Sequence, residues 1–523
     1  MSLIPFGEWM PDQPDFQNPG AAVATNVYPR TTQSYGPIAS LASAGLSALA
    51  LRCQGAVGCR DTSGNSYNFA GTATKLYEAT SAASSWTDVT RSSGGAYAAA
   101  SEEQWHFAQN GNLLIAMQIS DDIQVFTLGS SSNFSQLASA APKARYACVS
   151  KNFALFGNTS GGTADTSTPG VTPQRVWWPK IGDPTTWPTL GTAAAAIAQS
   201  DAQDIVGSQG WITGMVANIG PVDAVIFFEK AVFRAMYIGA PDIWGFWPAN
   251  GVRGCPVPGS IQAFEHGVIY VGPDDIYRFD GSSPASLGFL RVAKTFWTTV
   301  DQTYLSRVCS ALDPINKLYF LAYPSLTSGG GVLDTIIICN YELASNAGMQ
   351  GRWSSVTPNV TIEMFSQATT FGYNVDNFTS STGYTVDSAP AGPDSRLWTG
   401  NKDLLSAFDT THTFRYFTGS NLAPTVETSE SQLWPGRRSA PIRARPIVDG
   451  GSNIIVTPYM RNRIADSIAA KTASTMDSRG NVYFKDAEGY YSRFRLTMDA
   501  GSTFTHLQGV DIDKEDITES GDN

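Results

Sequence analysis

The sequence predicts an all-β protein built around a β-propeller, and three observations lead to this prediction. Charged residues make up only 15% of the 523 residues, against about 25% in an average soluble protein. Gly (49), Pro (29) and aromatic residues (11%) are plentiful, which favours short strands and turns over helices. Along the first two thirds of the chain, pairs of short apolar stretches separated by a turn recur, a pattern typical of β-hairpins.

The spacing of these hairpins predicts the number of propeller blades. Six hairpins are expected, at residues 66–80, 111–128, 151–181, 223–238, 266–281 and 316–342. Corresponding residues in successive hairpins are 40–50 positions apart, with one exception. The gap between the third and fourth hairpins is 72 positions and contains the loop 158–174 and the Ala-rich stretch 191–200. Most hairpins are followed by an aromatic residue and an apolar residue three places on, as in Trp86 and Val89. Four strands per 40–50 residues is the period of a propeller blade.

We therefore expect a six-bladed propeller over residues 46–360, since a ring of small sheets buries faces that one sheet alone leaves exposed. A large β-sandwich with coincidental spacing is the alternative. Residues 361–433 are rich in Ser, Thr, Asn and Gly without a clear period, so a loop-rich insertion is expected there. Strand patterns return over residues 434–510, where Phe494, Leu496 and Met498 alternate with polar residues, and predict an antiparallel β-sandwich-like module.

Charge is unevenly distributed along the chain, whose formal net charge is −11. Residues 434–498 hold eleven Lys or Arg and five Asp or Glu, a net charge of +6. The acidic tail, residues 511–523, holds six acids and one Lys, a net charge of −5. A basic module followed by an acidic tail suggests self-association or docking between charged partners. A solvated face and a frayed terminus explain the same pattern equally well.

The sequence argues against several classes of protein. No run of about 18 apolar residues exists to span a bilayer, and the N-terminus lacks the pattern of a signal peptide. We therefore expect synthesis in a cytoplasm. Six cysteines in so long a chain are expected to be free thiols, with Cys53 and Cys59 the one pair close enough in sequence to consider for a bridge. The net acidity argues against a general nucleic-acid binder.

Motifs that carry catalytic or metal chemistry are missing from the sequence. It contains no G-x-S-x-G elbow, no phosphate-binding loop and no C-x-x-C pair. The four histidines lack the spacing of metal ligands and are expected to be structural or surface residues: His106, His266, His412 and His506. Asp511, Asp513 and Glu515 resemble the start of a calcium loop, but Asp516 stands where the loop needs Gly. No catalytic, cofactor-binding or metal-binding residue is predicted.

Glycoside hydrolysis needs two carboxylates across a cleft, and Glu229, Asp274 and Asp275 are the residues that could be imagined in that role. Asp274 and Asp275 lie in a predicted hairpin turn, where acids are common for conformational reasons. Exposed tryptophans could stack on sugars, but packing between blades is the expected use of the five near the predicted insertion. These are Trp177, Trp178, Trp187, Trp244 and Trp247.

Three segments resemble a protein family of short-tailed bacteriophages (podoviruses). Gly7–Ile38 resembles the family's opening pattern G-E-W-x-P-D-x-P-x-x-x-N-P-G-x-x-x-A-x-N-V-x-P. Gly254–Gly281 is similar to its middle, and Tyr490–Asp513 is similar to its end. The three segments follow in the family's order and bracket nearly the whole chain. The family is that of tail nozzle or tail-hub proteins.

The resemblance implies a structural virion protein without enzymatic activity or cofactor. Six copies would form a ring below the portal and adaptor rings of a short tail, extend the DNA-ejection channel and dock tail fibres or spikes. Its partners would be further copies of itself, the adaptor, the fibres and genomic DNA, which would pass without sequence-specific binding. The resemblance does not identify which residues line the channel. An acidic channel wall would repel phosphates and let DNA slide.

The resemblance also implies that residues 1–45 form an extended arm along a neighbouring subunit. Pro5, Pro11, Pro14 and Pro19 agree with this, because proline excludes regular helix and discourages central strands. The alternative function is a receptor-binding or carbohydrate-binding propeller of the phage tail, with or without glycosidase activity.

Overall fold

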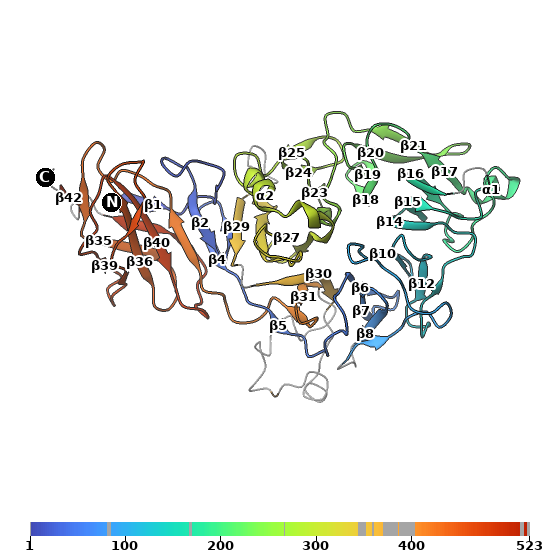
Figure 1. The fold of residues 1–523 in the computed structure, drawn as a ribbon, viewed down its shortest axis with the longest axis horizontal. Helices are drawn as coiled ribbons and strands as arrows, with labels where there is room; N and C mark the ends of the chain where they lie inside the picture. The colour runs from blue at the N-terminus through green and yellow to red at the C-terminus, as the bar shows by residue number, and fades with distance from the viewer. Residues whose placement is uncertain are drawn as a thin grey trace.

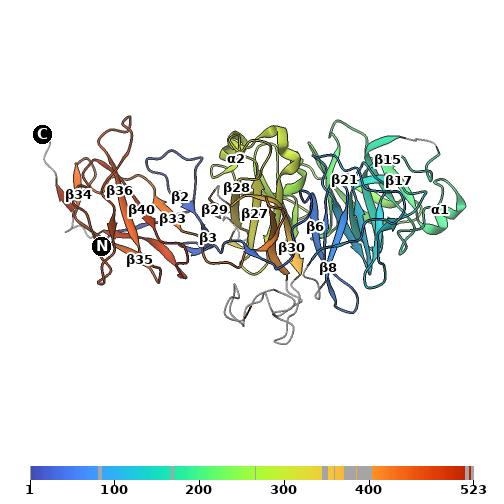
Figure 2. The same ribbon diagram turned by 60° about the horizontal axis from the view of Figure 1, so that its bottom comes forward.

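Small four-stranded antiparallel sheets follow one another along most of the chain and surround one axis. The computed structural model describes residues 2–80, 85–166, 170–265, 267–343, 352–357, 360–369, 385, 403–512 and 517–519. Within these residues six such sheets and the first four strands of a larger sheet form a ring of seven blades, and a second module extends from one side of it (Figures 1 and 2). The β-propeller expected from the sequence is therefore confirmed.

Blades 1 to 4 are formed by consecutive segments of the chain. The strands of each blade run in sequence order from the axis of the ring outwards. Blade 1 comprises β6 (Gly55–Arg60), β7 (Ser66–Gly71), β8 (Leu76–Thr80) and β9 (Thr87–Asp88). Blade 2 comprises β10 (His106–Asn110), β11 (Leu113–Met117), β12 (Gln124–Thr127) and β13 (Ser135–Gln136). Blade 3 comprises β14 (Lys143–Ser150), β15 (Phe153–Ser160), β16 (Val171–Trp178) and β17 (Asp201–Asp204), with helix α1 (Ala193–Ala198) before its last strand. Blade 4 comprises β18 (Ile212–Ile219), β19 (Val222–Phe228), β20 (Val232–Gly239) and β21 (Ile243–Pro248).

The other three blades complete the ring. Blade 5 comprises β22 (Gln262–Phe264), β23 (Gly267–Val271), β24 (Ile276–Phe279) and β25 (Pro284–Ser286), preceded by the 3-10 turn η1 (Pro258–Ser260). Helix α2 (Ala293–Thr299) and the 3-10 segment η2 (Gln302–Arg307) lead to blade 6: β26 (Cys309–Asp313), β27 (Leu318–Tyr323), β28 (Thr335–Asn340) and β29 (Arg352–Val356). Blade 7 comprises β30 (Ile362–Thr369), β31 (Asp403–Asp409), β32 (Phe414–Tyr416) and, from the N-terminal region, β5 (Ala42–Ser43).

The predicted count of six blades is wrong by one, and the region predicted as a loop-rich insertion, 361–433, supplies the missing blade. Its strands β30, β31 and β32 pair as one antiparallel sheet, and β30 lies against β6 of blade 1 to close the ring. The hairpin pattern failed here because residues 370–402 separate the first two strands. The fourth strand, β5, comes from the other end of the chain and pairs with Arg415 and Tyr416.

Apolar clusters between consecutive blades form the core of the propeller. Phe69, Phe126 and Phe134 pack edge to face between blades 1 and 2, and comparable clusters lie between the following pairs. In blade 7, Phe408 is fully buried and its ring contacts Trp86 of blade 1 and Phe414. Because each sheet buries both faces against its neighbours, a blade is stable only inside the ring.

The second module is a β-sandwich, as expected, but its strands come from both ends of the chain. They are β1 (Ser2–Pro5), β2 (Ala21–Thr25), β3 (Val27–Thr31), β4 (Ser34–Pro37), β33 (Thr425–Thr428), β34 (Ser439–Pro441), β35 (Arg443–Val448), β36 (Ile455–Arg461), β37 (Ala469–Ala470), β38 (Ser474–Thr475), β39 (Val482–Tyr483), β40 (Tyr491–Thr497), β41 (Leu507–Ile512) and β42 (Ile517–Glu519). One sheet has the order β3-β4-β41-β35-β39 with β1 beside β41, and the other contains β2-β33-β40-β36-β37. Phe6, Tyr35 and Phe494 are among the apolar side chains buried between them.

The predicted arm, residues 1–45, is therefore built into its own chain. Its strands β1–β4 complete the sandwich and β5 completes blade 7. Proline did not prevent this, because Pro5 lies at the end of the short strand β1, where a missing N–H group is tolerated. The predicted tail, 511–523, begins inside β41, and β42 pairs with β34.

One continuous sheet joins the propeller to the sandwich. The outermost strand of blade 6, β29, is followed by β2 and then by β33 and β40 of the sandwich. Thr25 of β2 pairs in parallel with Ser355 of β29, and their hydroxyl oxygens lie 3.0 Å apart. The left-handed residue Asn26 (φ 61°) accepts a hydrogen bond from the Thr357 N–H group and donates one to the Ala423 carbonyl.

A second set of contacts ties the N-terminal region to the segment after blade 5. The Asp12 carboxylate accepts hydrogen bonds from the N–H groups of Lys294 (2.9 Å) and Thr295 (2.8 Å) in the first turn of α2. An acid at a helix N-terminus satisfies donors that have no partner inside the helix. Glu8 forms an ion pair of 2.8 Å with Arg291. The N-terminal region thus connects the propeller and the sandwich through these contacts as well as through the continuous sheet.

Buried ion pairs account for part of the basic charge of residues 434–498. Glu430, which is fully buried, receives two hydrogen bonds of 2.6 Å from the Arg461 guanidinium. Glu427 pairs with Arg493 (3.3 Å) and Arg495 (2.6 Å). Three of the eleven basic side chains are therefore partnered by acids that precede this segment.

Replacing Phe408 with Ala tests whether residues 403–409 are the core of a blade. We expect the free energy of unfolding to fall by about 3–5 kcal/mol, because the large buried ring leaves a cavity. Chemical denaturation followed by tryptophan fluorescence measures it. Thr410→Ala, at an exposed position of the following turn, should change stability by no more than about 0.5 kcal/mol. Equal effects of the two substitutions would contradict a seventh blade.

Replacing Glu430 with Ala leaves the Arg461 charge partly buried without its partner. A loss of about 3–5 kcal/mol is expected, again measured as a shift of the denaturation midpoint. Glu488→Ala is the matched control, since Glu488 pairs with Arg438 at 3.5 Å on a partly exposed surface and should contribute about 0–1 kcal/mol. A Glu430 effect as small as the control would show that the buried pair does not hold the sandwich.

Candidate functional site

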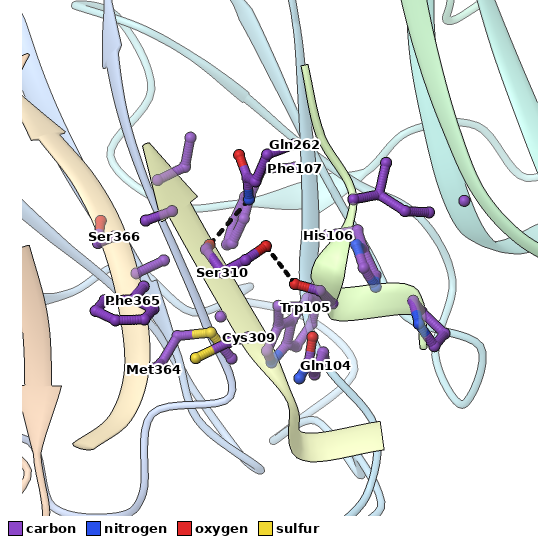
Figure 3. A pocket seen from close by; sticks show the side chains of 18 of the residues that line it. Gln104, Trp105, His106, Phe107, Gln262, Cys309, Ser310, Met364, Phe365 and Ser366 are labelled. Atoms are coloured by element: carbon purple, nitrogen blue, oxygen red, sulfur yellow. Dashed lines mark hydrogen bonds between the residues drawn. The ribbon is translucent and has the colours of Figure 1, made fainter. Parts of the chain in front are cut away.

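The axial channel of the propeller is the site at which all the blades meet. It has a volume of about 360 Å³ and is lined by residues of the seven inner strands or of the segments just before them. These strands are β6, β10, β14, β18, β22, β26 and β30. Figure 3 shows side chains that line this space, among them His106 of blade 2, Gln262 of blade 5 and Ser310 of blade 6.

The channel wall carries no charge near neutral pH. Its lining residues include no Asp, Glu, Lys or Arg. Removal from bulk water, together with the nearby Arg145 charge, lowers the pKa of His106 to about 4, so this imidazole is neutral. Burial raises the pKa of the Cys309 thiol to about 12. The channel therefore offers hydrogen-bonding groups and apolar surface.

The polar side chains of the channel mostly bind the backbone between blades. Gln262 of blade 5 donates a hydrogen bond of 2.9 Å to the Ser310 carbonyl of blade 6, and the Ser310 hydroxyl donates one of 2.6 Å to the Gly259 carbonyl (Figure 3). Gln367 of blade 7 donates to the Leu312 carbonyl at 3.3 Å. These contacts stabilise the packing of inner strands, which is a structural role.

A short charged segment, residues 101–104, crosses the end of the channel at which the inner strands begin. It precedes β10 of blade 2, yet Gln104 donates a hydrogen bond of 2.7 Å to the Ser306 carbonyl just before β26 of blade 6. Glu102 accepts hydrogen bonds of 2.6 and 2.9 Å from Arg307, and Glu103 forms a 2.5 Å ion pair with Arg145 of blade 3. Blades on opposite sides of the axis are thus linked across this mouth.

The histidines are not brought together. His106 lies in the channel wall, and its ring packs against Tyr146 with the centroids 4.6 Å apart. His412 contacts Glu363 at 2.7 Å in blade 7, and His506 contacts the Ser34 hydroxyl at 2.9 Å in the sandwich. His266 lies outside the described residues. In the described part of the chain, no group of three or more His, Cys, Asp or Glu side chains is arranged to hold a metal ion.

The three carboxylates considered for glycoside hydrolysis lie away from the channel. Asp275 accepts hydrogen bonds from the N–H groups of Ile276 (2.6 Å) and Gly288 (3.0 Å), which is the turn role expected from sequence. Burial raises its pKa. Asp274 accepts a 2.9 Å hydrogen bond from the Tyr277 hydroxyl, and Glu229 lies in an exposed turn of blade 4. None of the three is among the residues that line the channel.

Four of the five tryptophans pack between blades, as expected. Trp177 and Trp187 are buried between blades 2 and 3, and Trp178 and Trp244 between blades 3 and 4. Trp247 differs, because 44% of its surface is exposed. Trp211, which was not among the five predicted tryptophans, is also exposed.

The structure places the six cysteines and the first residue of the segment that resembles a calcium loop. All six cysteines are free and buried, and burial raises the pKa of both the Cys53 and the Cys59 thiol to about 12. Asp511 lies in β41 in register with Arg445, so it belongs to a strand. Asp513 and Glu515 lie outside the described residues.

No sequence pattern predicted the channel residues, Gln104 and Gln262 among them. They lie on the first strand of a blade or just before it, and those strands are less apolar than the hairpins that follow them. An assignment of all four strands in each repeat would have found them.

No helix among the described residues is long and apolar enough to cross a membrane. No protein-family model matches the chain, and no curated protein matches it. Solved structures similar to it include one from the mitotic checkpoint complex, at 9% identity with a TM-score of 0.39, covering 73% of this chain and 94% of that one. The WD40 repeats of RRP9 align at 9% identity with a TM-score of 0.37, covering 71% and 98%. YCF48 bound to a D1 peptide aligns at 12% identity with a TM-score of 0.34, covering 60% and 84%.

The pKa of His106 predicts how the channel responds to acid. Because the folded chain holds this pKa near 4 and an unfolded histidine titrates near 6.5, its contribution to stability is present above pH 6.5 and is lost as the pH falls towards 4. The difference in unfolding free energy between the wild type and His106→Phe should therefore shrink over that range. Denaturation midpoints at several pH values measure this difference. A difference independent of pH would contradict a neutral His106.

Proposed function

We propose that this chain is a structural component of a short bacteriophage tail. Six copies form a nozzle or hub ring that extends the DNA-ejection channel below the portal and adaptor and docks tail fibres or spikes. In this proposal DNA passes without sequence-specific binding, and the chain is made in the host cytoplasm and acts in the virion without catalysis.

The observation that carries the proposal is the place of the three segments that resemble the phage family. Gly7–Ile38 and Tyr490–Asp513, at opposite ends of the chain, lie in the same sandwich, where β4 pairs with β41 and β33 joins β2 to β40. Gly254–Gly281 forms most of blade 5, which leads into the helix capped by Asp12. The segments therefore belong to the frame that unites the two modules, as shared features of a structural family should.

Mechanical continuity supports the same proposal. The sheet that runs from β26 of blade 6 to β36 of the sandwich makes one elongated body, visible in Figures 1 and 2. A ring that guides DNA needs subunits that keep their shape under load. The neutral channel wall, crossed by residues 101–104 at one mouth, suits a scaffold better than a catalyst.

Exposed aromatic residues favour the alternative, a propeller that binds receptors or carbohydrates. Trp247 and Trp211 expose 44% and 53% of their surfaces, and aromatic faces stack on sugars. We rank this function second, because a glycosidase needs two carboxylates across a cleft and the channel is lined by none.

Cryo-electron microscopy of intact particles that contain this chain tests the proposal. The expected result is six propellers around an axial channel directly below the adaptor ring. Finding the chain at a fibre tip, in another symmetry, would overturn the nozzle function and favour receptor binding. Trp247→Ala and Trp211→Ala would then be compared with the wild type for binding to host-envelope glycans.

A further inference from the structure

Three glutamine amides of the axial channel are fixed at one end and open at the other. Gln104, Gln262 and Gln367 belong to blades 2, 5 and 7. Each donates a hydrogen bond to a backbone carbonyl of residues 306–312, in or just before β26 of blade 6. A carbonyl can only accept, so the NH₂ end of each amide faces the backbone and its oxygen faces away. Figure 3 shows this for Gln262, whose oxygen lies on the side away from Ser310.

These three amide oxygens are therefore acceptors that folding has left available. No hydrogen bond from a described residue reaches them. They form a row along the inner strand of blade 6, because the carbonyls that hold the amides follow one another along that segment. A ligand in the channel would meet this row with groups that donate hydrogen bonds.

Thr213 adds a buried hydroxyl without a partner. It lines the channel from β18 of blade 4, is only 7% exposed, and forms no hydrogen bond within the described chain. A β-bulge places it there, since Ile212 pairs with Phe228 and Gly214 with Phe227, which leaves Thr213 as the extra residue. Bulges redirect side chains and are common beside binding sites. A buried hydroxyl left unpaired is destabilising, so a ligand that bonds to it would remove that cost.

The inner strands and His106 supply further donors and acceptors. Each of the seven inner strands is the last in its sheet and pairs on one side only. Its other edge leaves backbone N–H and C=O groups towards the axis. The imidazole of His106 forms no hydrogen bond with a described residue, and in its neutral form it offers one donor and one acceptor. The channel can thus both accept hydrogen bonds from a ligand and donate to it.

The wall also determines the charge of the ligand. Among the lining residues there is no Lys or Arg to pair with an anion and no Asp or Glu to balance a cation, and burying an unpaired charge is costly. Trp105, Phe107 and Phe365 place aromatic surface between the polar groups. A volume of about 360 Å³ lies in the range of small-molecule sites. Hydroxyl groups, apolar C–H faces and the absence of charge are combined in a neutral sugar.

We infer that the axial channel of the propeller binds an uncharged saccharide, whose hydroxyls bond to the Gln262 and Gln367 oxygens and to the Thr213 hydroxyl. The saccharide enters at the mouth where the inner strands end, because residues 101–104 cross the other mouth. Gln367, near the end of β30, is exposed there. The inference rests on the channel alone and is independent of the number of copies and of a place in a phage tail.

Titration of the full-length chain with a panel of uncharged saccharides tests the inference. The panel consists of glucose, galactose, N-acetylglucosamine, maltose, lactose and chitobiose. We expect at least one member to bind with a Kd of about 1 mM or tighter, measured by isothermal titration calorimetry. The amino sugar and the uronic acid that match the ring of the bound member should bind at least about tenfold more weakly, because the wall cannot balance their charge.

Two substitutions of similar shape locate the site. Thr213→Val removes the unpartnered hydroxyl and Gln367→Met removes an amide oxygen. Each should weaken binding by about tenfold, because one hydrogen bond to the saccharide is lost. Thr213→Val should not lower the denaturation midpoint, since the hydroxyl has no partner in the described chain.

Gln109→Met is the matched control. Gln109 is an exposed residue of the inner strand β10 and donates to the Gly111 carbonyl at 2.8 Å, but it is not among the residues that line the channel. This variant should bind like the wild type. The inference is overturned if no member of the panel binds, if a charged counterpart binds more tightly than its uncharged parent, or if Thr213→Val and Gln367→Met bind like the wild type.

The proposed function and this inference fail separately. A saccharide bound in the channel, together with particles that show the chain at a fibre tip, would refute the nozzle function alone. A sixfold nozzle in particles, together with a chain that binds no saccharide of the panel, would refute the channel site alone. Binding lost in Trp211→Ala or Trp247→Ala but kept in Thr213→Val would place the saccharide on the exposed tryptophans and overturn the channel site.

Discussion

The integrity of the whole molecule depends on the pairing of β2 between β29 and β33. This five-residue strand is the only member of the continuous sheet that touches both the outermost strand of blade 6 and the sandwich, within the described residues. Ala21 and Ala24 are fully buried in it, since larger side chains would separate the flanking layers. At its end Asn26 bonds to backbone groups on both sides. Without β2, the propeller and the sandwich would lose the sheet that joins them.

The same N-terminal region also supplies strands to blade 7 and to the sandwich. β5 supplies the outermost strand of blade 7, more than 300 residues away in sequence from the strand it pairs with, while β1 pairs with β41 at the far end of the chain. Such non-local pairing has a large loop-closure cost, which must be offset by the packing it enables. Blades 1–5 can each form from local contacts, but blade 7 and the sandwich require both chain ends. Blade 7 and the sandwich are therefore complete only when strands from both chain ends have paired.

Sequence patterns predicted the strands that pair within one repeat. They did not predict pairings between strands that are far apart in the chain. The hairpins of blades 1–6 were predictable because their strands are joined within one repeat. Blade 7 was not, because residues 370–402 separate β30 from β31 and β5 lies before blade 1. The prolines of residues 1–45 correctly excluded helix, yet no periodicity states which strand an extended segment will pair with. The channel was equally invisible, since Gln104, Gln262 and Gln367 come from three different blades and meet only when the ring closes.

The size of the propeller channel constrains where DNA runs in the proposed ring. The channel, with a volume of about 360 Å³, is the size of a small-molecule pocket. A DNA duplex is too wide for it, because its major groove alone is about 12 Å wide. Gln104 and Glu102 also bridge one mouth to Ser306 and Arg307. DNA in the proposed nozzle therefore passes between subunits, along surfaces that several copies present together, and not through any single propeller. In this arrangement the acids that repel phosphates lie on the outside of the subunit, away from the neutral wall around His106.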